Sequence, residues 1–419
     1  MLSSWVNDGS VHNKAVFEAF ARRLPEGRRY GMLAGLGRLL RLVERFTFSD
    51  AEVEWLEAEG VVNGATAAYL RDFRFSGDID AYREGDLYFP GSPVLTVTGT
   101  LGECLVLETL VLSVLNHDTA IASAAARMAT AAGDRPLVEM GSRRAHEAAA
   151  IAVARAAYVA GFASTSNLAA GRLYGIPTVG TASHAFTLAH ESEEAAFRSQ
   201  VEAHGADTTL LVDTFDVTDG IRTAIKVAGP GLGAVRIDSG DLADEAQKAR
   251  LLLDELGATE TKIIATSDLD EFVITALADA PIDGYGVGTR VATGSGHPTA
   301  SMVYKLVAVA DEPGADSPMH PVAKKSAAKV SVGGHKTAFR EYADGYVVRE
   351  AFAVDTDDVP GRPLQVAAMR DGRIVHQPSL EEIRAFAAEQ LATLPADATN
   401  VAAGPPHVTV TLDHEGAPA

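Results

Sequence analysis

Four short apolar runs indicate the fold class of this chain: TLLVDTFD (209–216), GAVRIDSGD (233–241), KIIATSDLD (262–270) and IDGYGVGT (282–289). They recur roughly 20 to 30 residues apart, which is the spacing of βα units in a parallel sheet or barrel. Each run finishes in polar residues. Because ligands of such folds bind at the C-terminal ends of the strands, we expect these polar ends to face one common pocket.

The stretch just before these runs, 139–190, adds three features that suit an anionic ligand. Gly141–Arg144 places two arginines at the start of an Ala-rich helical run, where free N–H groups and guanidiniums favour an anion. Ser164–Asn167 is again small and hydroxylated, and Gly180–His184 ends in an imidazole. An arginine pair alone is usually solvated, and a single His usually belongs to the core. Together the three features predict an anion pocket that contains a titratable group.

Composition limits the class of protein. The chain has 419 residues, 47% of them hydrophobic, which is enough for two or three domains. Its net charge of −20 argues against nucleic acid or an anionic membrane as a partner. Cys104 is the one cysteine, and the apolar run around it is too short and too acidic for a membrane span. The start of the sequence lacks the pattern of a signal peptide, so we expect a cytoplasmic protein.

The two ends of the chain share a pattern of short strands separated by turns. Residues 11–70 are expected to be mostly helical, with Ser49 or Asp50 as one N-cap. Short strands separated by turns are predicted for 74–98 and again for 330–376. We therefore expect both ends to build one composite domain. The predicted boundaries are residues 1–115 and 313–419 for that domain and 116–312 for the α/β barrel.

Several residues at the predicted strand ends are candidates for chemistry. Alternation along a strand puts Arg236 and Asp238 on one face. They form either an ion pair at the barrel end or a ligand site, in which Arg236 holds a carboxylate. In the second case Asp238 or Asp241 binds sugar hydroxyls or a Mg²⁺-held polyphosphate. Gly286–Thr289 is similar to a phosphate-binding nest, and Ser267–Asp268 would form a neighbouring wall.

These segments together resemble one family. GSRRAH, FASTSN, GIPTVGTASHAF, LVDTFD, VRIDSGDL and GVGTRVATGSGHPTASMVYKL are similar to segments of nicotinate phosphoribosyltransferases, in order and with family-like spacing. The resemblance covers nearly the whole chain. It implies a type II phosphoribosyltransferase, an irregular α/β barrel with an α+β sandwich domain built from both chain ends, working as a homodimer. The reaction it implies joins nicotinate to 5-phosphoribosyl 1-diphosphate, with Mg²⁺ held through the substrate diphosphate and ATP as co-substrate.

The resemblance also assigns roles. It makes His184 the transiently phosphorylated histidine, with Asp213 as its orienting partner. Asp238 would hold the ribose, Arg143 a phosphate and Arg236 the nicotinate carboxylate. The remaining substrate-binding candidates are Ser166, Thr181, Asp241, Ser267, Gly288 and Thr289, of which Ser267, Gly288 and Thr289 would surround the 5-phosphate.

Alternatives remain at this stage. Relatives that use nicotinamide have an Asp where this chain has Ser166; because Ser can donate to a carboxylate and Asp would repel it, nicotinate is favoured. Relatives also carry a Tyr that stacks on the pyridine ring. It lies upstream of the segment that Leu2–Trp5 matches, so this sequence does not show it. An inactive metabolite-binding relative therefore stays open as the non-enzymatic alternative. Quinolinate-using relatives and a sugar-phosphate isomerase or aldolase rank lower.

Overall fold

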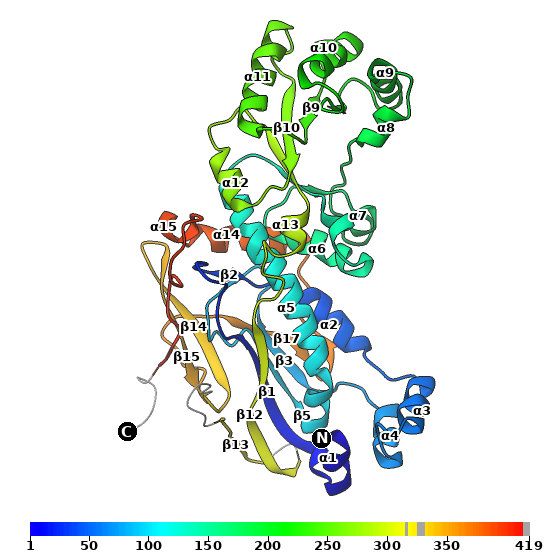
Figure 1. The fold of residues 1–419 in the computed structure, drawn as a ribbon. Helices are drawn as coiled ribbons and strands as arrows, with labels where there is room; N and C mark the ends of the chain where they lie inside the picture. The colour runs from blue at the N-terminus through cyan, green and yellow to red at the C-terminus, as the bar shows by residue number, and fades with distance from the viewer. Residues whose placement is uncertain (315–316, 325–331, 414–419) are drawn as a thin grey trace. The chain divides into compact units, whose positions relative to one another are not determined.

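The computed structural model describes residues 1–314, 317–324 and 332–413, and within it the chain divides into two compact units (Figure 1). The first unit is Met1–Ala120 with Pro298–Ala419, and the second is Ile121–His297. Residues 298–312, which we predicted as part of the barrel, belong to the first unit because most of them form a strand that pairs with its sheet. Of the segment predicted as 313–419, residues 315–316, 325–331 and 414–419 lie outside the described part.

The first unit contains a seven-stranded sheet that both chain ends build. Its order is β13-β12-β1-β5-β3-β17-β18. β12 pairs antiparallel with β1, and β17 pairs antiparallel with β3, so strands some 290 residues apart are neighbours. The strand bounds are β1 Asn13–Ala21, β3 Asp78–Tyr82, β5 Leu95–Thr100, β12 Met302–Pro313, β13 Met319–Pro321, β17 Gln365–Arg370 and β18 Arg373–Ile374.

Two smaller sheets and a set of helices complete the first unit. The four-stranded sheet is β16-β14-β15-β19 and the two-stranded one is β2-β4. Their strands are β2 Gly31–Met32, β4 Leu87–Tyr88, β14 Lys336–Ala343, β15 Tyr346–Val354, β16 Arg362–Pro363 and β19 Thr411–Leu412. The helices are α1 Leu2–Asp8, η1 Ser10–His12, α2 Leu36–Arg45, α3 Asp50–Ala58, α4 Gly64–Arg71, α14 Leu380–Ala392 and α15 Ala396–Thr399. One apolar core draws on both larger sheets, with Phe17 and Val97 from one and Ala338 and Phe352 from the other.

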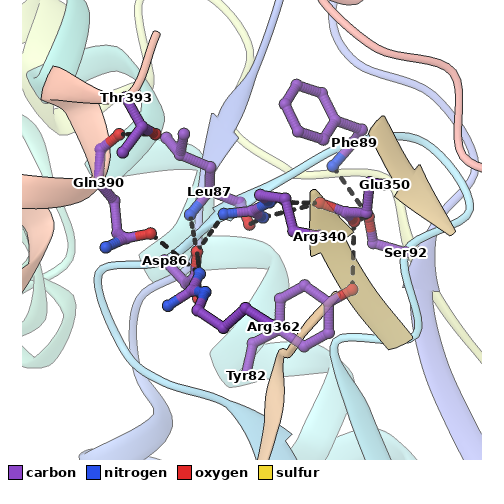
Figure 2. Close-up of polar contacts among 10 residues, drawn as sticks. All are labelled: Tyr82, Asp86, Leu87, Phe89, Ser92, Arg340, Glu350, Arg362, Gln390 and Thr393. Carbon is purple, nitrogen blue, oxygen red and sulfur yellow. Dashed lines mark hydrogen bonds and ion pairs between the residues drawn. The ribbon is translucent and has the colours of Figure 1, made fainter. Parts of the chain in front are cut away.

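A buried charge network joins β14 and β15 to the segment before β4, as Figure 2 shows. Arg340 is completely buried and donates to Glu350 Oε2 at 2.7 and 2.9 Å and to Asp86 Oδ1 at 2.7 Å. Glu350 also accepts the hydroxyls of Tyr82, at 3.1 Å, and Ser92. Each charge in this cluster therefore has hydrogen-bonded partners, which a buried ion needs.

Helix α5, Leu101–Ala132, is long and apolar enough to cross a membrane by length and composition alone. Its side chains Leu107, Val111 and Leu115 are completely buried in the core of the first unit, and half of its most apolar window is buried. This packing is that of a core helix. The predicted domain boundary after residue 115 falls inside this helix, whose residues after Ala120 belong to the second unit.

The second unit is built on a six-stranded parallel sheet of order β7-β6-β11-β10-β9-β8. β7 and β8 are its edges, so the sheet is an open one. The strands are β6 Leu137–Glu139, β7 Ser164–Thr165, β8 Thr209–Leu211, β9 Ala234–Ile237, β10 Lys262–Ser267 and β11 Gly284–Val287. The four runs of the sequence supply β8 to β11. The predicted combination of a parallel α/β unit with a unit built from both chain ends is confirmed.

Helices follow the strands of this sheet along the chain (Figure 1). They are η2 Gly141–Arg144, α6 Glu147–Val159, α7 Leu168–Tyr174, α8 His184–Leu188, α9 Glu193–His204, α10 Val217–Ala228, α11 Leu242–Glu255, α12 Glu271–Ala276 and α13 Thr289–Ala292. Asp216, Asp241 and Asp270 are the N-caps of α10, α11 and α12. The last Asp of three of the four runs thus accepts the free N–H groups of the helix that follows.

Candidate active site

The C-terminal ends of four neighbouring strands, β6, β9, β10 and β11, line a cavity of about 210 Å³ in the second unit. Six predicted site residues lie on its wall: Arg143, Arg236, Asp238, Ser267, Gly288 and Thr289. Arg144, Thr266 and Asp268 line it as well. The first run, 209–216, which supplies β8, contributes no lining residue; it contacts the site through Asp213, which accepts from Asp238 and Ser239.

Arg236 is fixed by three hydrogen bonds. Nε donates to Thr266 Oγ1 at 2.9 Å, one terminal nitrogen donates to Thr181 Oγ1 at 2.6 Å, and the other to Asp238 Oδ1 at 2.9 Å. Its side chain is 13% exposed. A guanidinium has five N–H groups, so one N–H on each terminal nitrogen remains for a ligand. The guanidinium is thus held in place and can still donate two hydrogen bonds to a planar anion.

Asp238 stands at the centre of the polar groups. Its Oδ1 accepts from Arg236 and from the hydroxyl of the buried Thr266, and its Oδ2 is 3.8 Å from Nε2 of His184. Burial raises the pKa of this carboxyl, but the hydrogen bonds from Thr266 and Arg236 and the charges of Arg236 and His184 outweigh burial and lower it. Asp238 is therefore an anion at neutral pH, next to the cavity.

The ends of β10 and β11 show close packing and backbone strain. Ser267 has φ 137°, a region that residues other than glycine rarely occupy and that is concentrated at functional sites. A Cβ on Gly286 would lie 2.6 Å from Cγ2 of Thr266 and 2.8 Å from Sδ of Met140, so only glycine fits there. Gly288 then caps the short helix α13, which begins at Thr289.

His184 is the first residue of α8, and its side chain is 43% exposed. Its Nε2 is 3.9 Å from Oδ1 of Asp213 and 3.8 Å from Oδ2 of Asp238. Nδ1 lies 3.3 Å from the hydroxyl of Thr214. One ring nitrogen thus faces two carboxylates and the other faces a hydroxyl, while the ring itself stays accessible.

The two oxygens of the buried Asp213 carboxylate differ in their hydrogen bonding. Oδ2 accepts the N–H of Asp238 at 2.9 Å and the hydroxyl of Ser239 at 2.7 Å, which fixes the turn after β9. Oδ1 has no hydrogen-bond partner among the residues that the structure describes, and it is the atom that faces His184. A buried oxygen without a partner is costly, which is typical of a site that functions.

Comparisons with known proteins show the family to which the chain belongs. Residues 1–116 match the N-terminal domain of nicotinate phosphoribosyltransferase. A nicotinate phosphoribosyltransferase of Mycobacterium tuberculosis is 54% identical over 97% of this chain and 92% of its own length. One from Bacillus subtilis is 40% identical over 81% of this chain and 71% of its own. The chain belongs to the nicotinate phosphoribosyltransferase family.

A solved structure shares the fold of this family. Human nicotinic acid phosphoribosyltransferase matches with a TM-score of 0.82 at 24% identity, covering 98% of this chain and 96% of the human one. Together with the family membership, this confirms the predicted fold class, a type II phosphoribosyltransferase.

The other predicted site residues lie off the wall of the 210 Å³ cavity. Thr181 reaches it through its bond to Arg236 and itself lines an adjoining cavity of about 530 Å³. Asp241 is exposed and accepts from the N–H groups of Ala243 and Asp244, so it serves as a helix cap. Ser166 is exposed beside the end of β7.

Two residues that contact predicted site residues were not predicted from the sequence: Thr214, which contacts His184, and Thr266, which contacts Arg236. Both lie inside the quoted runs: Thr214 comes directly after Asp213, and Thr266 comes directly before Ser267. A polar residue within an apolar strand end was the available signal for Thr266. Which partner each hydroxyl meets depends on neighbouring strands, so sequence spacing alone does not reveal it.

Proposed function

We propose that this protein is an ATP-dependent nicotinate phosphoribosyltransferase, which joins nicotinate to 5-phosphoribosyl 1-diphosphate and releases diphosphate and nicotinate mononucleotide. This activity would serve NAD salvage from nicotinate. The observation that carries the proposal is the cavity at the strand ends, where a held guanidinium, an anionic carboxylate and a glycine-rich turn meet. Family membership supports the same reaction.

The phosphoribosyl group would occupy the cavity between β9 and β11. We propose that Ser267, Gly288 and Thr289 bind the 5-phosphate and that Arg143 contacts a phosphate of the diphosphate. Asp238, held ionised, would face the ribose. Attack at the anomeric carbon builds positive charge on the sugar, and a fixed carboxylate stabilises that charge without reorganising.

Nicotinate would enter with its carboxylate toward Arg236. The two N–H groups that Arg236 has left suit a bidentate carboxylate, and three existing bonds keep the fork in place. Ser166 is proposed to donate a further hydrogen bond to the same carboxylate. Nicotinamide lacks the charge that makes this contact strong, so it should be a poor substrate.

ATP coupling is proposed to use His184. Asp213 and Asp238 face Nε2, so they stabilise a proton there. The lone pair is then on Nδ1, which would attack the γ-phosphorus of ATP; the bond to the β,γ-bridging oxygen breaks and ADP leaves, with Thr214 adjacent to the transferred group. The exposure of the ring permits such an encounter.

Mg²⁺ is proposed to arrive with the diphosphate of the substrate. Among residues 1–314, 317–324 and 332–413 no group of three or more His, Cys, Asp or Glu side chains is placed to hold a metal ion. Asp238 and Asp268 on the cavity wall fit a Mg²⁺ that keeps phosphate and water ligands. Such an ion would neutralise charge on the leaving diphosphate.

We further propose a homodimer in the cytoplasm, as the resemblance implies. The second unit exposes the large apolar side chains Leu168, Leu173, Val179, Leu188 and Phe215, which suit a protein contact. The single cysteine, buried Cys104, suits a reducing compartment. Sedimentation at falling concentrations, followed together with specific activity, tests whether dimerisation and turnover are linked.

Turnover itself is tested with purified protein, nicotinate, 5-phosphoribosyl 1-diphosphate and Mg²⁺, with and without ATP. We expect nicotinate mononucleotide and diphosphate in equal amounts, more of both with ATP, and little product from nicotinamide. Equal rates on both pyridines would reassign the substrate. No product from either pyridine would support the alternative, an inactive metabolite-binding protein.

A further inference from the structure

Glu139 is a buried carboxylate that the proposed chemistry does not use. It is the last residue of β6, is completely buried, and lies between β7 and β11. Its Oε1 accepts the N–H of Gly141, and its Oε2 accepts the hydroxyl of Thr165 at 2.5 Å. Its main-chain oxygen accepts the N–H of Ser166 at 2.8 Å. One residue is thus bonded both to the segment that carries Arg143 and to the segment that carries Ser166.

Thr165 extends these contacts to a third segment. Its hydroxyl accepts the N–H of Asn167 at 2.9 Å, and the Asn167 amide donates to Ser142 Oγ at 3.0 Å. Its main chain bonds to Pro177 O and to the N–H of Val179, both at 3.0 Å. Residues 177–179 lead directly to Thr181, the partner of Arg236. The carboxylate of Glu139 therefore fixes a network that reaches three parts of the site.

The packing around Gly141 shows how tight this network is. A Cβ on Gly141 would lie 2.9 Å from Oε1 of Glu139, 2.9 Å from the main-chain oxygen of Gly288 and 2.8 Å from Cβ of Ala292. Any side chain there would push the turn away from the carboxylate or from Gly288. The segment before Arg143 is therefore held against the phosphate-binding turn by close contact as well as by hydrogen bonds.

The charge of Glu139 has no evident structural benefit. No ion pair to it occurs within the described part of the chain. Burial raises the pKa of the Glu139 carboxyl, and the hydrogen bonds from Thr165 and Gly141 offset only part of that rise. Ionising such a group costs stability. An anion nevertheless has one advantage over an amide, because it accepts from both donors at once.

We propose that Glu139 is a positioning residue for both substrates: its buried carboxylate holds the Arg143 segment and the Ser166 segment in one geometry. The inference rests on the proposed function, in which Arg143 contacts a phosphate and Ser166 contacts nicotinate. Glu139 touches neither substrate. It acts through Gly141 on one side and through Thr165 on the other.

Glu139→Gln tests this inference with almost no change in volume. The amide oxygen can accept from the Gly141 N–H, but the NH₂ group then faces Thr165, whose hydroxyl loses its acceptor. We expect KM to rise on the order of tenfold for nicotinate and for 5-phosphoribosyl 1-diphosphate together. The thermal midpoint should stay within about 4 °C of the parent, because the amide relieves the cost of a buried charge.

Two further variants separate positioning from simple loss of structure. Thr165→Ser keeps the hydroxyl and should retain near-parental KM values, whereas Thr165→Val should behave as Glu139→Gln does. The matched control is Glu103→Gln in the first unit, another buried carboxylate that accepts from hydroxyl and N–H groups, of Ser76 and Thr100. It should leave both KM values unchanged.

Hydrogen exchange decides the structural step independently of the reaction. In Glu139→Gln the amides of residues 140–144 and 164–167 should exchange faster together, while the rest of the sheet exchanges as in the parent. Unchanged exchange in either segment overturns the inference, as does a KM change for one substrate only. An inactive parent would instead reject the proposed function, and the exchange data would still decide the role of Glu139.

Discussion

Arg236 offers a direct test of substrate choice at the level of one side chain. Replacing it by Ala removes the fork proposed to hold the nicotinate carboxylate. We expect nicotinate binding to weaken by about 1.5–3 kcal/mol, which is the range for hydrogen bonds to charged groups. Titration calorimetry with nicotinate in the absence of 5-phosphoribosyl 1-diphosphate, so that no turnover occurs, measures the loss.

Arg236→Lys is the control for this variant. It keeps the positive charge but loses the planar fork and at least two of the three bonds to Thr181, Thr266 and Asp238. Its affinity should therefore fall between those of the parent and the Ala variant. Parental affinity in Arg236→Ala would remove this residue from carboxylate binding.

His184 tests the route of ATP coupling. His184→Ala should abolish ATP hydrolysis, because no imidazole nitrogen remains to take the phosphoryl group, while a slower ATP-independent transfer persists. Phosphate release and nicotinate mononucleotide formation are followed in parallel. His190→Ala is the matched control, since His190 lies just after the same short helix, α8, and contacts the main-chain oxygen of Phe186. ATP hydrolysis that survives in His184→Ala would place the acceptor elsewhere.

Glu193 gives a pH dependence at the same scale. Burial, followed by the charges of Asp219, Asp213 and Asp216, raises the pKa of its carboxyl from the ordinary 4.5 to about 6. A raised folded-state pKa means that stability is fully present below about pH 4.5 and is lost as the pH rises through about 6. Glu193→Gln should remove this loss. The thermal midpoints of the parent and of Glu193→Gln, measured from pH 4 to 7, should coincide at the acid end and differ at neutral pH.

The exposed Glu191, two residues earlier, supplies the comparison for that measurement. Glu191→Gln should keep the pH dependence of the parent. Parallel curves for Glu193→Gln and the parent would show that Glu193 does not titrate differently in the folded protein.

At the level of single elements, the parallel strands were predictable and the exact use of their polar ends was not. The spacing of the four runs correctly indicated β8 to β11, because buried parallel strands are apolar throughout and end at turn residues. All three Asp residues that end a run, however, cap the following helix. Periodicity cannot distinguish a cap from a ligand, and the substrate-binding role of Asp241 stays a prediction.

Strand β1 shows a second limit of element prediction. Residues 11–70 were expected to be mostly helical, and that was wrong for residues 13–21, which form a strand between β12 and β5. Nearly all of its residues are buried, so it lacks the alternation that marks a half-exposed strand. Local cap signals worked better: Ser49 caps α3, with Glu52 completing the capping box, as the sequence pattern indicated.

Across the whole chain, the pattern of short strands and turns at both ends was enough to predict that they form one unit. It could not give the pairing, because β17 meets β3 and β12 meets β1 through contacts between residues about 290 apart. Nor could it reveal the network around Arg340, whose partners come from both ends of the sequence (Figure 2). Those partners are specified by tertiary packing, which sequence spacing does not encode.

That network makes the last prediction one about the stability of the composite unit. Arg340→Met leaves the carboxylates of Glu350 and Asp86 buried. Glu350 then lacks its only ion-pair partner in the described part of the chain. Removing one partner of a buried pair typically costs about 3–5 kcal/mol. Urea unfolding followed by circular dichroism should show a loss of that size. Arg349→Met, which breaks more exposed pairs to Glu341 and Asp413, should cost about 1 kcal/mol or less.

A second substitution shows where the cost of Arg340→Met arises. Adding Glu350→Gln removes the uncompensated charge, so the double variant should recover part of the lost stability although it has fewer of the native charges. Additive losses would instead mean that Arg340 stabilises the unit through Leu87 and its packing, independently of Glu350. Because the 210 Å³ cavity is lined only by residues of the second unit, folded Arg340→Met should bind nicotinate as the parent does.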